Sequence, residues 1–391
     1  MATSNVSGAK ALFTPLKLGD ITIPNRVMMT ALTRNRTSNT VPSDLMTKYY
    51  AQRAQGGAGL IVAEGILISR QGTEWQNAPG IWSSEQIAGW KKITDAVHAS
   101  GSFIYAQLWH VGRLSHPDAP QQKLAGVPVP APSAIAARGG TFRFLPGAPG
   151  YVTASSFPTE IEDPALFVKL FKDAAINAKE AGFDGVELHG AGGYLVQQFL
   201  DNTSNKRGDK WGGSVENRSR FGLEVLKALI SVFGKNVAIK LSPAVGFNDV
   251  GMPLQETLKT FRYFIAEADK LGLSYITLMR YSPMMDVTLE DGTSRATQHD
   301  VLESYRSSIK HTNLFLNVGL TPEEGAKLIE EGKIDGAGYG IPWIAHPDFA
   351  LRVKHGKPAD TQPNWQLMQI GEGDLAEKWG AGYTDYPALT E

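Results

Sequence analysis

Short apolar runs recur along the whole chain, and the stretches between them carry apolar residues at helical spacing. Near-continuous apolar runs are typical of parallel strands that are covered on both faces. The runs predict eight strands: RVMMTAL, GLIVAEG, SFIYAQL, GVELHG, NVAIKLSP, SYITLM, LFLNVG and AGYG, of which the last is a weak signal by itself. Eight strands alternating with helices favour an α/β fold, a single (β/α)8 TIM barrel, over a doubly wound open sheet.

Two of the intervening helices carry clear end signals. Ser83 and Gln86 form the S-x-x-Q start of a helix that Gly101 ends. Asp163 followed by Pro164 reads as the N-cap and first residue of another helix. The apolar stripe predicted for this second helix is Leu166, Leu170, Ala174 and Ala178.

One long segment, residues 115–163, interrupts the alternation. It is rich in Pro, Gly, Ala and Ser and carries no convincing helix signal. In a barrel, a loop after the third strand lies on the face where the active sites of barrel enzymes are found. An open dinucleotide-binding sheet would show a G-x-G-x-x-G turn after an early strand, and none follows the first three strands here. We therefore predict one barrel domain over residues 1–391, with an excursion over its active face.

Composition and charge narrow the range of partners. The formal charge of −1 provides no basic surface for nucleic acid or an anionic membrane. The chain has no Cys, which excludes disulfides, thiolate zinc sites and cysteine-ligated clusters, so redox work needs a bound organic cofactor. The N-terminal residues lack the apolar core of a secretory signal, and no apolar run approaches the roughly 18 residues that span a bilayer. We expect a cytoplasmic protein with a small-molecule partner.

In a barrel, the residues at the carboxyl ends of strands are the first candidates for chemistry. The polar and aromatic residues at these positions are Thr33, Glu64, Gln107, Trp109, His189, Lys240 and Arg280. The chain has no H-E-x-x-H and no G-x-S-x-G, which argues against a zinc hydrolase and an esterase. We predict no metal site. The donors suit a planar, polar heterocycle, although His189 taken alone could equally be a core or capping residue.

Lys240 and three late glycines sharpen this prediction. Lys240 lies within an apolar strand, where a buried ammonium group needs an anionic or carbonyl partner. Gly319, Gly338 and Gly340 lie near the ends of the last two strands, where barrel enzymes often bind phosphate. Glycines at strand ends are also ordinary turn residues, so both explanations stay open at this point.

Several longer motifs, in order along nearly the whole chain, make the sequence recognisable. They include LFTPLKLGDITIPNRVMMTALTRNR, YYAQRAQGGAGLIVAEG, YAQLWHVGR, AGFDGVELHGAGGYLVQQFLD, DKWGGSVENRSRF, IKLSP, IPWIAHPDF and GYTDYP. The chain resembles the Old Yellow Enzyme family of FMN-dependent ene reductases. The resemblance implies FMN as cofactor, NADPH or NADH as reductant, an activated alkene as substrate, and a monomer or homodimer.

The resemblance assigns roles on the flavin side. Thr33 matches the threonine near the flavin C4 carbonyl, and Gln107 matches the glutamine at the pyrimidine edge. Lys240 stands where the family carries a cation near N1 and C2=O, and Glu64 with Gly65 matches a loop packed on the isoalloxazine. Backbone groups expected at the phosphate are those of Gly319, Tyr339 and Gly340.

The resemblance also assigns the substrate side. His189 matches the first member of an H-x-x-N or H-x-x-H pair that grips the substrate oxygen, and Tyr194 matches the tyrosine that protonates the α-carbon. Trp109 and Tyr386 resemble residues that shape the pocket. Gly192 stands where the second donor of the pair belongs, so only one donor of that motif remains.

Removal of one oxyanion donor from other enzymes slows them by roughly two to three orders of magnitude. We expect the missing donor at Gly192 either to slow reduction of simple enones or to be compensated. Candidates for compensation are an ordered water, a donor from residues 115–163, Arg280, or a bulkier substrate that fills the space.

Two further departures lie at the phosphate end. Ile341 stands where the family usually carries an arginine on the phosphate, and Val318 stands where glycine is common. We therefore expect FMN with weaker retention. The main prediction is an NAD(P)H-dependent ene reductase; the alternatives are a natural-product isomerase or dehydrogenase, and an idle barrel that binds a small molecule or a protein partner.

Overall fold

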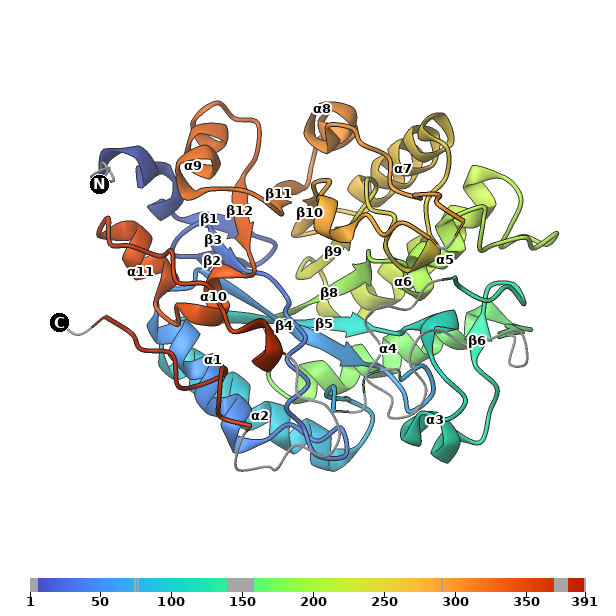
Figure 1. Ribbon diagram of the computed structural model, residues 1–391, viewed down its shortest axis with the longest axis horizontal. Helices are drawn as coiled ribbons and strands as arrows, with labels where there is room; N and C mark the ends of the chain where they lie inside the picture. The colour runs from blue at the N-terminus through green and yellow to red at the C-terminus, as the bar shows by residue number, and fades with distance from the viewer. Residues whose placement is uncertain are drawn as a thin grey trace.

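Eight parallel strands close into a barrel at the centre of the molecule (Figure 1). The computed structural model describes residues 6–73, 75, 77–138, 158–289, 291–368 and 379–389. The barrel strands are β3 (Val27–Met29), β4 (Leu60–Leu67), β5 (Phe103–Trp109), β8 (Gly185–Gly190), β9 (Val237–Leu241), β10 (Tyr275–Met279), β11 (Asn313–Asn317) and β12 (Gly336–Tyr339). Each of the eight predicted runs contributes one of them. Around the barrel the order is β10-β11-β12-β3-β4-β5-β8-β9, which confirms the (β/α)8 barrel and excludes the open sheet.

Helices surround the strands in Figure 1. The α-helices are α1 (Asp44–Gln55), α2 (Ser84–Ala99), α3 (Pro120–Ala125), α4 (Pro164–Glu180), α5 (Leu195–Leu200), α6 (Val215–Phe233), α7 (Leu254–Asp269), α8 (Val301–Tyr305), α9 (Pro322–Glu330), α10 (Pro342–Ala345) and α11 (Phe349–Lys354). The 3-10 helices are η1 (Val6–Phe13), η2 (Gly112–Leu114), η3 (Phe247–Asp249), η4 (Pro283–Met285), η5 (Arg306–Ser308) and η6 (Trp365–Leu367). None of the helices in the described ranges is long and apolar enough to cross a membrane.

The helix starts follow their local signals. The side chain of Ser83 accepts the N–H of Gln86 while the Gln86 side chain accepts the N–H of Ser83, a complete capping box at α2. Asp163 caps α4 through the N–H of Ala165. The predicted stripe of α4 is partly wrong. Its buried face is Phe167, Phe171, Ala174, Ala175 and Ala178, whereas Leu166 is 61% exposed and Leu170 is half-buried. The two phenylalanines lie seven and three residues before Ala174, on the same helix face, and they displace the leucines from the core.

The amino end of the barrel is filled. The hairpin of β1 (Leu16–Leu18) and β2 (Ile21–Ile23) packs there against the first inward residues of the strands. This inner cluster comprises Leu18, Ile23, Met28, Leu60, Val62, Tyr105, Ala238, Tyr275 and Phe315. Polar inward residues follow these apolar ones along the strands, so the carboxyl end is the polar one.

The described parts of the excursion after β5 contain more regular structure than expected. It contains α3, which the sequence did not predict, and the short β6 (Pro130–Ala131) pairs with β7 (Thr159–Glu160). Arg138 on this segment donates to Asp249 in the loop after β9, at 3.0 Å. The contact supports the expected position of the segment at the carboxyl face. Residues 139–157 of the excursion lie outside the described residues.

Candidate active site

Three aromatic side chains meet at the carboxyl ends of β5 and β8. Trp109 ends β5, His189 lies on β8, and Tyr194 follows β8 by four residues. The imidazole of His189 and the Trp109 ring lie with centroids 6.1 Å apart and an angle of 23° between their planes. The Tyr194 ring meets both of them edge-on, at 4.9 Å from each. The fold therefore brings together three of the residues predicted on the substrate side.

His189 is a neutral hydrogen-bond donor in this setting. Its Nδ1 accepts the N–H of Ala191 at 3.3 Å, which places the proton of the neutral imidazole on Nε2. Desolvation, helped by the charge of Lys240, lowers the pKa of His189 to about 3. At neutral pH the side chain thus presents an N–H donor without a positive charge.

The loop at Gly192 is held tightly beside this donor. The N–H of Gly192 donates to Ser242 Oγ at 2.9 Å, and its carbonyl accepts Asn248 Nδ2 at 2.7 Å. Gly192 has φ +64, and a Cβ there would lie 3.3 Å from Tyr194 Cε2 and 3.8 Å from His189 Cε1. The vacant second position of the donor pair is therefore next to His189. Ser242 and Asn248, which set this loop, were missed in the sequence because each is an ordinary loop residue far away in the chain.

A buried polar group lies deeper in the barrel. Gln107 donates through Nε2 to Glu187 Oε1 at 2.7 Å. Burial raises the pKa of Glu187, and the charge of Lys240 opposes that rise. Burial in turn lowers the pKa of Lys240, and Glu187 counteracts it. The charge that favours the ionised form of the buried lysine is thus that of Glu187, a residue of GVELHG that the sequence analysis did not single out.

Strand alternation explains why these side chains converge. Val186 and Leu188 pack outward against the helices, so Glu187 and His189 point into the barrel. On β9, the outward Ile239 leaves Lys240 facing inward, and in the strand register it stands opposite His189. The inner face of the barrel at this level is therefore built from polar groups.

Glu64 points elsewhere. Its Oε2 accepts the N–H of Arg34 at 3.2 Å, and its Oε1 accepts the hydroxyl of Tyr50 on α1 at 3.3 Å. Burial raises the pKa of Glu64 to about 7. The backbone N–H of Glu64 also donates to the Tyr50 hydroxyl, at 2.9 Å, so both its side chain and its N–H are bonded to α1. The contact of Glu64 with the isoalloxazine stays a prediction. The neighbouring Gly65 lets the Trp109 ring approach, since a Cβ there would lie 2.6 Å from Trp109 Cε3.

The sequence profile of the NADH:flavin oxidoreductase / NADH oxidase family matches residues 11–360. A solved Old Yellow Enzyme homologue from Zymomonas mobilis superimposes with a TM-score of 0.84 at 32% identity, covering 97% of this chain and 99% of that one. The chain belongs to the Old Yellow Enzyme family.

Two curated relatives show the range of this family. The NADP-dependent oxidoreductase lnbE of Aspergillus flavus is 39% identical over 358 residues, covering 89% of this chain and 90% of the relative. The probable inactive reductase easA of Epichloe festucae var. lolii is 36% identical over 401 residues, covering 100% and 97%. As a member of the Old Yellow Enzyme family, this chain is an oxidoreductase with FMN as cofactor and a nicotinamide reductant.

The hydrogen-bond donors of this chain fit the flavin heterocycle of the Old Yellow Enzyme family. Gln107 and Lys240 come from β5 and β9, the two strands on either side of β8, so an amide and a cation face the same space. Thr33 lies half-buried in the segment after β3. An amide, a hydroxyl and an ammonium group are the donors that the carbonyl and nitrogen edges of an isoalloxazine require.

The phosphate end lies at β11 and β12. Val318 has φ +77 and Gly319 has φ +65, and a Cβ on Gly319 would meet no atom within 4 Å. The Tyr339 ring is turned outward, with its hydroxyl near the Thr321 carbonyl at 3.4 Å, so only its backbone faces the barrel mouth. Ile341 is 39% exposed. The backbone at this end is therefore accessible to a phosphate group, but an apolar side chain stands where the family usually has an arginine.

Two predicted substrate-side residues do not join the aromatic cluster. Arg280 is bonded to the Val318 carbonyl and to Glu324, at the phosphate end. Tyr386 lines a cavity of about 500 Å³ with Gln52, Pro347, His355 and other residues of α1, α11 and the C-terminal segment. Its hydroxyl accepts the N–H of Asn364 at 2.8 Å. We carry neither residue forward as a substrate contact.

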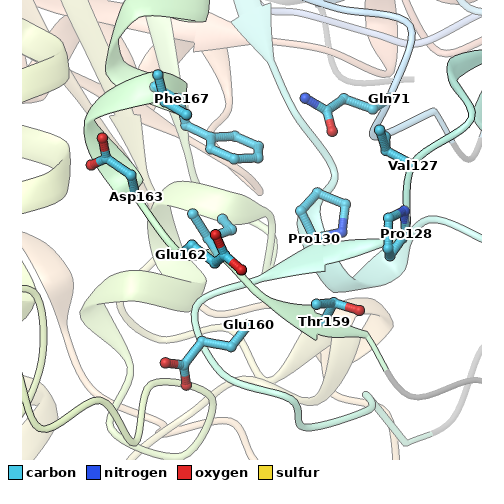
Figure 2. Close-up of a pocket in the computed structure, with 11 residues that line it drawn as sticks. Gln71, Val127, Pro128, Pro130, Thr159, Glu160, Glu162, Asp163 and Phe167 are labelled. Carbon is cyan, nitrogen blue, oxygen red and sulfur yellow. The ribbon is translucent and has the colours of Figure 1, made fainter.

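A smaller cavity of about 170 Å³ lies between the excursion and α4 (Figure 2). Figure 2 shows the Phe167 ring on the α4 side and Val127, Pro128 and Pro130 on the other. None of the predicted catalytic or flavin-binding residues lines it. This cavity is distinct from the candidate active site.

Proposed function

We propose that the protein is an NAD(P)H-dependent ene reductase that reduces an α,β-unsaturated carbonyl compound, with Tyr194 as the proton donor. The cluster of Trp109, His189 and Tyr194 carries the proposal, because it sets a neutral donor and a phenol side by side at the mouth of a flavin-binding barrel. Bound FMN would supply hydride to the β-carbon of the substrate.

His189 would polarise the substrate. Negative charge builds on the carbonyl oxygen as hydride reaches the β-carbon, so the Nε2–H bond to that oxygen strengthens in the transition state. A neutral imidazole suits this role, because its pKa of about 3 keeps it from protonating the reduced flavin or a neighbouring carboxylate at neutral pH.

Tyr194 would deliver the proton to the α-carbon. Its ring is oriented by edge-on contacts to both His189 and Trp109, and the residue is only partly buried. A fixed phenol one ring away from the polarising donor can reach the carbon adjacent to the carbonyl.

Below the substrate, Gln107 and Lys240 would hold the heterocycle. Lys240 would supply positive charge where reduced flavin is negative. The negative charge of Glu187 favours the ionised form of Lys240 and offsets part of its positive charge. Thr33 would contact the opposite carbonyl edge.

A second candidate, an isomerase or dehydrogenase on a natural product, rests on Gly192. With a single donor from this motif, polarisation of a simple enone is weaker, and one close relative is named a probable inactive reductase. Such an enzyme would depend on a larger substrate whose shape uses the space above Gly192.

The deciding experiment follows the visible flavin band of the full-length holoprotein under anaerobic conditions. NADPH should bleach the band, and 2-cyclohexenone should then restore it with formation of cyclohexanone. Bleaching without recovery, on a panel of enones and nitroalkenes, would overturn the ene-reductase proposal and favour the second candidate.

A further inference from the structure

The carboxyl ends of β10, β11 and β12 lie side by side. In the register, Met279 pairs with Asn317, and Asn317 pairs with Gly338. The residues that follow these strands are therefore neighbours at the end where barrel enzymes bind phosphate. Of these neighbours, Arg280 carries a guanidinium group, whereas Ile341 is apolar.

We propose that Arg280 supplies the cation for the phosphate of FMN in this chain, in the place of the arginine that Ile341 lacks. This inference rests on the FMN site and not on the identity of the alkene substrate.

Arg280 is held in a defined position. Its Nε donates to the Val318 carbonyl at 3.0 Å. Its two terminal nitrogens donate to Glu324 Oε1 at 2.8 Å and Oε2 at 2.9 Å. A guanidinium group has five N–H donors, so two remain beyond these three bonds, and the side chain is 28% exposed. The group is oriented in advance and still has donors to offer an anion.

The backbone beside Arg280 is open and strained. A β-branched residue rarely adopts the left-handed conformation of Val318, φ +77, and such outliers cluster at ligand sites. The adjacent Gly319 has open space where a Cβ would stand. The guanidinium that binds the Val318 carbonyl therefore stands next to a backbone that a phosphate can approach.

Glu324 limits the strength of this site. Its hydrogen bond with Arg280 lowers the pKa of the carboxyl group, so the pair is ionised and close to neutral overall. The hydrogen bonds of the guanidinium would thus contribute more than its net charge, which matches the weaker retention of FMN expected from Ile341.

The test compares FMN with riboflavin, which has the same ring and lacks the phosphate. The full-length holoprotein is diluted, and the fluorescence of released flavin gives the dissociation constant; the protein is then reloaded with riboflavin and measured again. Arg280→Gln should raise the dissociation constant for FMN about 10-fold or more and leave that for riboflavin within about 2-fold, as for loss of a charge-assisted hydrogen bond.

Two variants complete the design. Arg280→Lys keeps the charge without the fork and should lie between wild type and Arg280→Gln, which also covers the case in which the glutamine variant does not fold. Arg262→Gln is the matched control. Arg262 lies on the outer helix α7 and, like Arg280, donates to a backbone carbonyl, that of Ser304. Equal weakening of FMN and riboflavin, or no change in either, would overturn the proposal. Neither result depends on reduction of an alkene.

Discussion

At the scale of single residues, the site is defined by what stands next to His189. Its neighbours are an aromatic ring, a phenol and a glycine in the left-handed conformation. Gly192 and Tyr194 can be changed separately, because both lie in the loop after β8 and not on a barrel strand.

Tyr194→Phe should slow the oxidative half-reaction with an enone about 100-fold or more, since general acid catalysis contributes roughly that factor. The ring contacts to His189 and Trp109 stay in place. Stopped-flow traces of flavin reduction by NADPH serve as the internal control and should be unchanged. Equal loss in both half-reactions would remove Tyr194 from the role of proton donor.

Gly192→Asn should raise the rate with cyclohexenone about 10-fold, because it restores a donor beside His189. Asparagine tolerates the left-handed conformation better than other residues, and only the Tyr194 ring, 3.3 Å from the new Cβ, has to yield slightly. Gly192→Ala is the matched control for strain and bulk without a donor. If both variants behave alike, another group already fills the role.

Val318→Gly should increase the free energy of unfolding by up to about 1 kcal/mol. It removes the left-handed strain of a β-branched residue, roughly 1–2 kcal/mol, and this gain is partly offset by the greater flexibility of glycine in the unfolded chain. Urea unfolding of this variant beside Val318→Ala, which keeps the Cβ, measures the difference. A glycine variant less stable than the alanine variant would contradict the strain assignment.

At the scale of elements, the site depends on three adjacent strands. β5, β8 and β9 bring Gln107 level with Glu187, and Lys240 level with His189, on the inner face of the barrel, although these residues lie far apart in the chain. None of these strands could bury its polar residue alone, because the hydrogen bond and the opposite charge that compensate it come from its neighbours.

Lys240→Met should destabilise the protein by about 3 kcal/mol, because it leaves the buried carboxylate of Glu187 without its counter-charge. In the double variant Lys240→Met/Glu187→Gln, most of that loss should be recovered. Urea unfolding of the two single variants and the double variant gives the coupling between the residues. Additive losses would show that the two charges do not compensate one another.

At the scale of the whole molecule, three buried arginines tie the C-terminal segment to the barrel. Arg34 donates to the Gly382 carbonyl and Arg36 to that of Leu367, both at 2.6 Å, and Arg53 donates to that of Tyr383 at 3.3 Å. Arg34 immediately follows Thr33, so the last described segment is packed against the loop that carries a predicted flavin contact. The buried carboxylate in this group is Glu64.

Glu64 makes stability depend on pH. Its pKa is raised from 4.5 to about 7 in the folded protein, so the folded state binds a proton that the unfolded state has released above pH 4.5. The stabilisation is full below pH 4.5 and is lost as the pH rises through 7. The stability of wild type relative to Glu64→Gln should therefore fall between pH 5 and pH 8. Urea unfolding at both values tests this, and a constant difference would contradict it.

The local signals of the sequence were enough for the barrel strands and for two helix starts. Alternation and apolar runs predicted all eight barrel strands, and the capping patterns at Ser83 and Asp163 placed two helix starts, because caps and periodicity act within a few residues. The stripe of α4 and the helix α3 were not predicted correctly. Which face of a helix is buried depends on the partner that covers it, and α3 lies in a stretch whose composition suggested a loop.

The sequence by itself determined the strands, the family motifs and the identity of His189, Tyr194, Gln107 and Lys240 as candidates. Only the tertiary structure decided which of them meet. In the closed barrel, Glu187 lies on the strand between those of Gln107 and Lys240, and Gln107 donates to it. Tyr386 lies near α1, and Arg280 is bonded to Val318 at the phosphate end. These outcomes depend on contacts between side chains distant in the chain. The predicted barrel gives the order of the strands, but spacing along the sequence does not decide which side chain bonds to which partner.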